Sequence, residues 1–192
     1  LLGGKYPKTN DSGAVNNASG QRFWDSPTGQ WNLNTNWWTT SSNVISWSWA
    51  RARGYFDVVT YTGTGSARTL THNLGAAPEM MWVKCRSEAQ DWAVYHNNID
   101  SSSPEDYGIY LNDTASRVDS ANFWNDTAPT SSVFTVGTAG KTNGSSKTYI
   151  AYLFATVAGV SKVGSFTQSG ATNVDCGFTG DTPSFIIIKR TD

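Results

Sequence analysis

Aromatic rings flanked by amide side chains are the residues of this sequence that could most directly do chemistry. Six of the nine tryptophans lie in the first 50 residues, a stretch rich in asparagine and serine, and Trp124 stands before Asn125. Such rings stack on the C–H faces of sugars, while neighbouring amides bond the hydroxyls. We therefore predict tentative glycan contacts at Trp31, Trp37, Trp38, Trp124 and Asn125. The alternative, which we favour, is that these rings form core or subunit contacts.

Paired carboxylates would be needed if the chain cleaved glycans, because glycosidases place two of them about 5–9.5 Å apart. The candidates in the best-patterned region are Asp57, Glu79, Glu88 and Asp91. Acidic side chains usually lie at the surface, and we interpret these four as solvated. A polysaccharide depolymerase is therefore the less favoured function.

Nucleophilic and metal chemistry has little support in this sequence. Only His72 and His96 could serve as imidazole bases, and there is no Gly-x-Ser-x-Gly elbow. Cys85 and Cys176 do not cluster with the histidines as a zinc site requires, and two cysteines make no disulfide framework. We expect structural histidines, no cofactor, no metal and no catalytic residue. The disulfide state of the two cysteines and a bound calcium ion stay open.

An internal repeat organises the chain around these residues. The segment 54–87 aligns without gaps with 159–192, at a constant offset of 105 positions, and seven of the 34 aligned positions are identical. The conserved pairs are Gly54/Gly159, Val58/Val163, Thr62/Thr167, Gly65/Gly170, Gly75/Gly180, Pro78/Pro183 and Lys84/Lys189. Four of the seven are glycine or proline, which set turn geometry. The period is too long for a solenoid repeat of about 20–50 residues, so we infer domains in tandem.

This repeat predicts three regions. Residues 1–50 form a Trp- and Asn-rich segment, the end of a preceding unit or a linker; 51–157 form a complete unit; 158–192 begin a second, truncated unit. The second copy stops where the first continues into Asp91–His96, and the chain opens without methionine. We therefore expect a piece of a longer polypeptide.

Composition excludes several classes of partner. Only 15% of residues are charged and the formal net charge is −1, so neither nucleic acid nor an anionic membrane is an expected partner. The longest apolar run, Phe185–Ile188, is far shorter than the roughly 20 residues of a membrane span. Abundant aromatic residues among Gly, Ser, Thr and Asn favour strands and turns and are typical of an extracellular protein.

Alternating and apolar runs bounded by turn formers predict seven strands in the complete unit. Met80–Val83 and its copy Phe185–Ile188 are continuously apolar, which predicts a central strand covered on both faces. Ile45–Trp49 alternates apolar and polar residues and resembles the strand that precedes the second copy. We predict an all-β fold, an antiparallel β-sandwich of jelly-roll or lectin-like type. The strands are expected near 56–62, 68–72, 79–85, 91–96, 107–112, 132–136 and 148–155.

Several ordered motifs carry a family resemblance. They are the stretches 54–63, His72–Gly75 with Pro78, Trp82–Lys84, 91–96, 127–134 and 149–154. In that order they resemble a tandem-repeat β domain of virion structural and tail-fibre-like proteins of marine and cyanobacterial bacteriophages, a family without an assigned activity. The likeness covers residues 50–192 and carries over no catalytic residue.

The resemblance implies a structural function rather than an enzymatic one. We expect a component of a phage virion appendage, such as a tail fibre, spike or capsid fibre, at the virion surface. Its expected partners are further copies of itself, in a homotrimer by family analogy, other virion proteins and a host cell-surface glycan. The alternative is a cellular carbohydrate-binding adhesin module.

Overall fold

The computed structural model describes residues 49–171, 173–180 and 182–192, together with Ser12 and the backbone of four short strands near the N-terminus. These four strands form two separate two-stranded pairs, β1 with β2 and β3 with β4. Their bounds are β1 Lys5–Tyr6, β2 Asn16–Asn17, β3 Arg22–Phe23 and β4 Asn32–Leu33. The predicted strand Ile45–Trp49 lies outside the described residues except for Trp49 itself.

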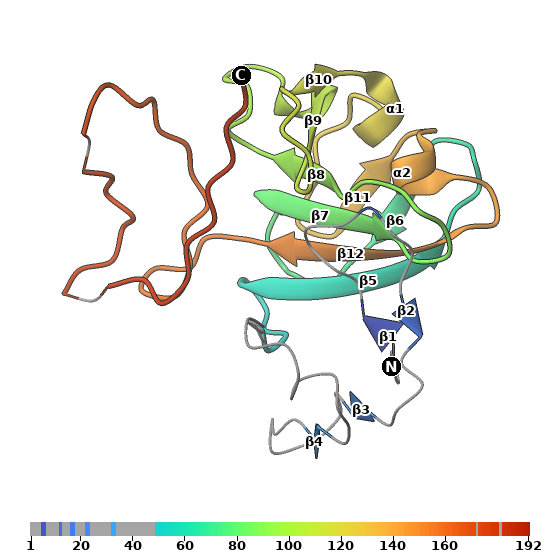
Figure 1. Cartoon of the computed structure of the whole chain (residues 1–192), viewed down its shortest axis with the longest axis horizontal. Coiled ribbons are helices and arrows are strands. Elements are labelled where there is room, and N and C mark those ends of the chain that lie inside the picture. Colours follow the sequence, from blue (N-terminus) through green and yellow to red (C-terminus); the bar gives the residue numbers. More distant parts are fainter. Residues whose placement is uncertain are drawn as a thin grey trace.

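The predicted all-β antiparallel sandwich is confirmed between β5 and β12 (Figure 1). A six-stranded sheet has the order β10-β9-β8-β7-β12-β5, and a two-stranded sheet pairs β11 with β6. The strands are β5 Phe56–Thr62, β6 Arg68–Thr71, β7 Met80–Cys85, β8 Ala93–His96, β9 Tyr107–Tyr110, β10 Val118–Asp119, β11 Val133–Val136 and β12 Thr148–Phe154. Three single turns of helix connect them: η1 Pro104–Asp106, α1 Ala121–Trp124 and α2 Gly140–Asn143.

Strand β7 is central, as its continuous apolar sequence predicts. It pairs with β12 on one side and with β8 on the other, and its side chains alternate between two clusters. Met81, Val83 and Cys85 face the inner core, whereas Trp82 faces the opposite side of the sheet. Both faces of the large sheet are therefore apolar at its centre.

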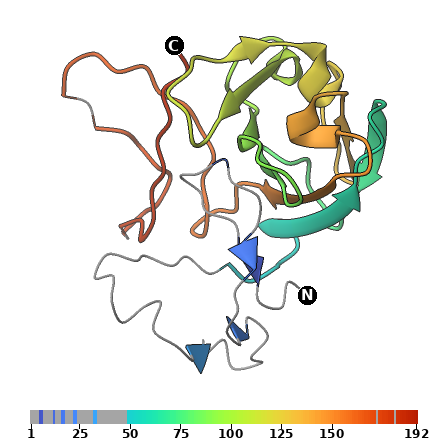
Figure 2. The ribbon, with the colours of Figure 1, turned by 45° about the vertical axis from the view of Figure 1, so that its right-hand side comes forward.

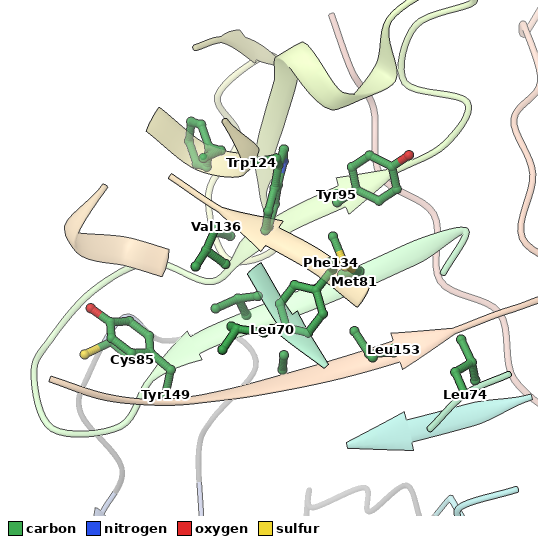
Figure 3. Close-up of a cluster of buried hydrophobic side chains, with 14 of the residues drawn as sticks. Leu70, Leu74, Met81, Cys85, Tyr95, Trp124, Phe134, Val136, Tyr149 and Leu153 are labelled. Atoms are coloured by element: carbon green, nitrogen blue, oxygen red, sulfur yellow. The ribbon is translucent and has the colours of Figure 1, made fainter. Parts of the chain in front are cut away.

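The inner core lies between the two sheets and contains mostly aliphatic and aromatic side chains (Figure 3). Leu70 from β6 and Phe134 and Val136 from β11 are 0–6% exposed and cover the large sheet. Beside them, Tyr61 stacks on Tyr149 with ring centroids 5.1 Å apart. Burying such rings excludes water and contributes about 1.5–3 kcal/mol per large side chain.

A second aromatic cluster covers the outer face of the large sheet. It contains Phe56, Trp82, Trp92 and Phe154, all 1–7% exposed, with Val94, Ile99 and Ile109. Trp49 packs edge-on against Trp82 and Phe154 at centroid distances of 6.2 and 6.0 Å. Trp82 and Trp92 are therefore core residues, and Trp49 is partly buried.

Two buried polar side chains hold loops in place. Lys84 is 0% exposed, and its Nζ donates to the backbone oxygens of Ser12 (2.7 Å) and Gln90 (2.6 Å). Asn143, also 0% exposed, donates to the oxygens of Ser66 (2.6 Å) and Gly137 (2.7 Å). Buried polar groups are tolerated when they are hydrogen-bonded in this way.

Residues after β12 differ from the sequence expectation of a second sandwich. In the described part of 162–192 no strand forms, and the chain runs outside the sandwich before returning near β9 and β10 (Figure 1, Figure 2). The expected strand at Phe185–Ile188 does not form in this structure. A tandem sandwich stays a prediction.

Removing the Phe134 ring should strongly destabilise the fold. We expect Phe134→Ala to lower the free energy of unfolding by about 3–5 kcal/mol, because the ring is 0% exposed between the sheets. Phe166→Ala is the matched control, since Phe166 is 45% exposed and should cost less than about 0.5 kcal/mol. Equal losses in urea denaturation would contradict the described core.

Candidate functional site

Of the predicted glycan residues, the structure describes only Trp124 and Asn125. Trp31, Trp37 and Trp38 lie outside the described residues. Trp124 is 1% exposed, packs edge-on against Tyr95, and donates from Nε1 to the Tyr107 oxygen at 2.9 Å.

The burial of Trp124 contradicts its predicted role as a sugar-stacking ring, because both its faces are covered by protein. Trp124 is the last residue of α1. The N-cap residue of this helix is Ser120, whose side chain accepts a hydrogen bond from the Asn122 amide. Asn125 follows in the left-handed conformation (φ 57°) and is exposed. A glycan contact at Asn125 stays a prediction.

Asp57 is not the solvated carboxylate that the sequence suggested. Its side chain is 4% exposed, lies 2.5 Å from Nη2 of Arg51, and accepts from the Asn73 amide at 2.7 Å. It ties the start of the unit to the turn after β6. Glu88 and Asp91 are partly exposed and pair with Lys147 and Lys141, each at 3.4 Å.

His72 has a structural environment. Its Nδ1 accepts from the Leu74 amide (3.2 Å), so Nε2 carries the proton and donates to the Thr130 oxygen (3.1 Å). It is 6% exposed and joins the turn after β6 to the loop before β11. Cys85 and Cys176 are both free thiols.

Metal-binding clusters and membrane-spanning helices are both absent from the described part of the chain. Among the described residues, no group of three or more His, Cys, Asp or Glu side chains is placed to hold a metal ion. Within the same part of the chain, no helix has the length and apolar character needed to cross a membrane.

The candidate site is the junction where the chain enters and leaves the sandwich. The turn at the entry and the turn at the exit have the same pattern of backbone hydrogen bonds. At the entry, the amides of Tyr55 and Phe56 donate to the Ala52 oxygen (3.1 and 3.0 Å), and Ala52 donates to the Phe56 oxygen (3.0 Å). The exit, 105 positions later, has the same three bonds. The amides of Val160 and Ser161 donate to the Val157 oxygen, both at 2.9 Å, and Val157 donates to the Ser161 oxygen at 3.1 Å.

Glycine makes both turns possible. Gly54 and Gly159 have φ of 82° and 73°, a conformation that side chains with Cβ rarely adopt. Two further pairs of aligned glycines share positive φ: Gly65 with Gly170, and Gly75 with Gly180. The repeat found in the sequence is thus a repeat of backbone conformation at these turns.

Side chains of the unit bind the exit segment. Glu79, just before β7, accepts from the Thr156 amide at 2.6 Å, and Thr156 Oγ1 accepts from the Val163 amide at 3.1 Å. His96, at the end of β8, hydrogen-bonds the Gly164 backbone, and its Nδ1 accepts from the Asn98 amide. The first residues of the second copy are therefore fixed against β7 and β8.

Sequence reasoning found the junction glycines but missed these polar contacts. In the repeat, Asp57 and Glu79 align with Lys162 and Ser184, so neither acid is preserved between the copies. Their partners come from segments distant in sequence, which leaves no local signal. Only the alignment of turn residues could have indicated the location.

Asp57 should matter for stability because it is a buried charge with two donors. We expect Asp57→Asn to lower the free energy of unfolding by about 1–3 kcal/mol, since one oxygen acceptor is lost and Arg51 loses its counter-charge. Glu88→Gln, in an exposed pair, should cost less than about 1 kcal/mol. Equal losses in chemical denaturation would contradict the structural role of Asp57.

His96 should make stability fall in mildly acidic solution. Burial lowers the pKa of His96 from its usual 6.5, against the opposing effects of Glu79 and the Gly164 hydrogen bond. The unfolded chain therefore binds the proton more tightly than the folded chain does. The contribution of neutral His96 to the free energy of unfolding is thus fully present above about pH 6.5 and is lost as pH falls toward the folded-state pKa. Thermal melts between pH 7.5 and 5.5 should show a smaller decrease in Tm for His96→Gln. The same decrease in both proteins would overturn the assignment.

Comparison with known proteins places the chain in a family without adding a ligand or a reaction. Neither the curated proteins nor the solved structures give a match. A family model described as a domain of unknown function, DUF7483, matches residues 8–192 and so spans the sandwich, the junction and both copies of the repeat. This chain therefore belongs to the DUF7483 family.

Proposed function

We propose that this chain is a non-catalytic structural segment of a bacteriophage virion appendage, located at the virion surface. The observation that carries the proposal is the entry turn at Ala52–Phe56, which recurs with the same hydrogen bonds at Val157–Ser161. A chain that begins the same turn again directly after its last strand is organised as a series of units. Such series build extended structural proteins.

The roles of the polar side chains support a structural rather than an enzymatic function. Asp57, Glu79 and His72 each hold turns of the sandwich through backbone hydrogen bonds. Lys84 likewise holds loops. A catalytic acid or base must reach a substrate, whereas these groups already bond the protein backbone.

The type of assembly comes from the motif resemblance to phage virion proteins. It implies a homotrimer, contacts with other virion proteins and binding to host-surface glycans. The glycan contacts would fall to Trp31, Trp37, Trp38 and Asn125, since Trp124 is in the core.

Oligomeric state tests this proposal. We expect light scattering coupled to gel filtration to give three times the 20.8 kDa mass of one chain, because virion appendages assemble by cyclic symmetry. The mass should not change on dilution. A monomer at all concentrations would count against an appendage, and monomeric sugar binding would favour the adhesin alternative.

A further inference from the structure

One identity of the internal repeat is not explained by turn geometry. Among the seven positions that are identical in the two copies, Lys84/Lys189 is the only charged pair, whereas four pairs are glycine or proline. The acids Asp57 and Glu79 of the first copy are not kept in the second. A charged side chain is costly to bury unless it is hydrogen-bonded. The recurring lysine therefore indicates a contact that both copies make.

Lys84 and Lys189 have the same kind of partner, which is the backbone of a loop far upstream. Lys84 Nζ donates to the Ser12 oxygen, 72 residues earlier, at 2.7 Å. Lys189 Nζ donates to the Asp113 oxygen, 76 residues earlier, also at 2.7 Å. It also donates to the Ala115 oxygen, 74 residues earlier, at 3.4 Å. Both lysines thus hold a segment that lies at nearly the same distance before them in the chain.

The two loops held in this way share a sequence motif. The first reads Asn10-Asp11-Ser12 and the second reads Asn112-Asp113-Thr114, so each has asparagine, aspartate and a hydroxyl residue in order. The acceptor oxygens belong to the last residue of the first motif and to the two neighbours of the last residue of the second. The motifs are offset by 102 positions, close to the 105 of the repeat, and surface loops tolerate such length changes. The lysine and its loop therefore recur together.

A backbone hydrogen bond accompanies each lysine contact. The Gln90 amide donates to the same Ser12 oxygen at 2.8 Å. In the second copy, the Arg117 amide at the end of the loop donates to the Thr191 oxygen at 2.9 Å. The C-terminal end of the chain consequently lies beside the loop between β9 and β10 (Figure 1).

Exposure in the C-terminal segment follows these contacts. From Ser184 to Asp192, Lys189 and Thr191 are partly buried and the other residues are exposed. These two are the residues that bond the loop at 113–117. The side of the segment that carries the lysine is therefore the side that rests on the first unit.

We propose that Lys84 and Lys189 form the contact between successive units, in which the lysine of each unit docks the Asn-Asp-Ser/Thr loop of the unit before it. The loop that contains Ser12 then belongs to the unit that precedes 51–157. An ammonium group offers three donors to backbone carbonyls, so the contact recognises the path of the loop. The interface rests on the serial organisation of the proposed function, but not on the virion assignment or the trimer. A monomer in light scattering would leave it standing.

Hydrogen exchange of the full chain tests the second contact at the Arg117 amide. We expect Lys189→Met to speed exchange of this amide by about tenfold or more, because a charged donor makes a strong hydrogen bond and its loss releases the loop from Thr191. Lys162→Met is the matched control, since Lys162 is exposed, and should leave the Arg117 amide unchanged. Unchanged exchange in Lys189→Met would overturn the proposal.

The first contact should give the corresponding result at the Gln90 amide. We expect Lys84→Met to speed its exchange, because the Ser12 oxygen that accepts from it is no longer held by the ammonium group. The amides of β12 should keep their protection. If they lose it, the whole unit has unfolded, and amine labelling of the unmodified chain decides the matter at Lys84.

Competitive acylation of amines makes that measurement. Lys84, which is 0% exposed, and Lys189 should react about tenfold or more slowly than Lys162, at every protein concentration. Equal rates for the three lysines would overturn the proposal. Protection of Lys189 that disappears on dilution would assign the loop to a second copy and would overturn it too.

A change in the loop gives the reciprocal test. Asp113 Oδ1 accepts from the Ala115 amide at 3.0 Å and so shapes the loop that Lys189 binds. Asp113→Ala should therefore speed acylation of Lys189 and leave that of Lys84 unchanged. The matched control is Asp175→Ala, because Asp175 Oδ1 makes the same kind of turn with the Gly177 amide at 2.8 Å, away from both lysine contacts. The same effect from both variants would contradict the docking of this loop.

Discussion

The pairing of the first and last strands of the sandwich is the constraint on which the rest of the structure depends. Strands β5 and β12 are antiparallel neighbours from Thr62 opposite Thr148 to Phe56 opposite Phe154. Because β12 also pairs with β7, this one strand joins the start, the centre and the end of the unit. Both apolar clusters and both junction turns are positioned by it.

The polar chemistry of the molecule serves that arrangement. Asp57 fastens the entry segment through Arg51, and Glu79 fastens the exit through the Thr156 amide. Asp57 directly follows the entry turn at Ala52–Phe56, and the partner of Glu79, Thr156, directly precedes the exit turn at Val157–Ser161. Their role is to fix the path of the backbone, because each accepts a hydrogen bond from a backbone amide.

The strands were largely predictable from the sequence because alternation, apolar runs and turn residues are local signals. The prediction for β5 matches the structure at 56–62, and β7 is central as its apolar run indicates. The burial of Trp124 was not predictable in this way, because it depends on the turn of α1 toward Tyr95. Likewise, one acceptor for Lys84 is the oxygen of Ser12, which lies 72 residues away. The candidate site could be located by the repeat, but its hydrogen bonds depend on tertiary contacts.

The adjacent entry and exit also determine how a unit responds to mechanical force. The Ala155 amide donates to the Tyr55 oxygen at 3.0 Å, so the segment that enters the sandwich and the segment that leaves it lie at the same end. Hydrogen bonds between antiparallel strands run perpendicular to the strands. Tension between Arg51 and Thr156 would therefore load these bonds one after another and unzip β5 from β12, rather than shear all of them together. A unit of this design resists pulling along the chain weakly.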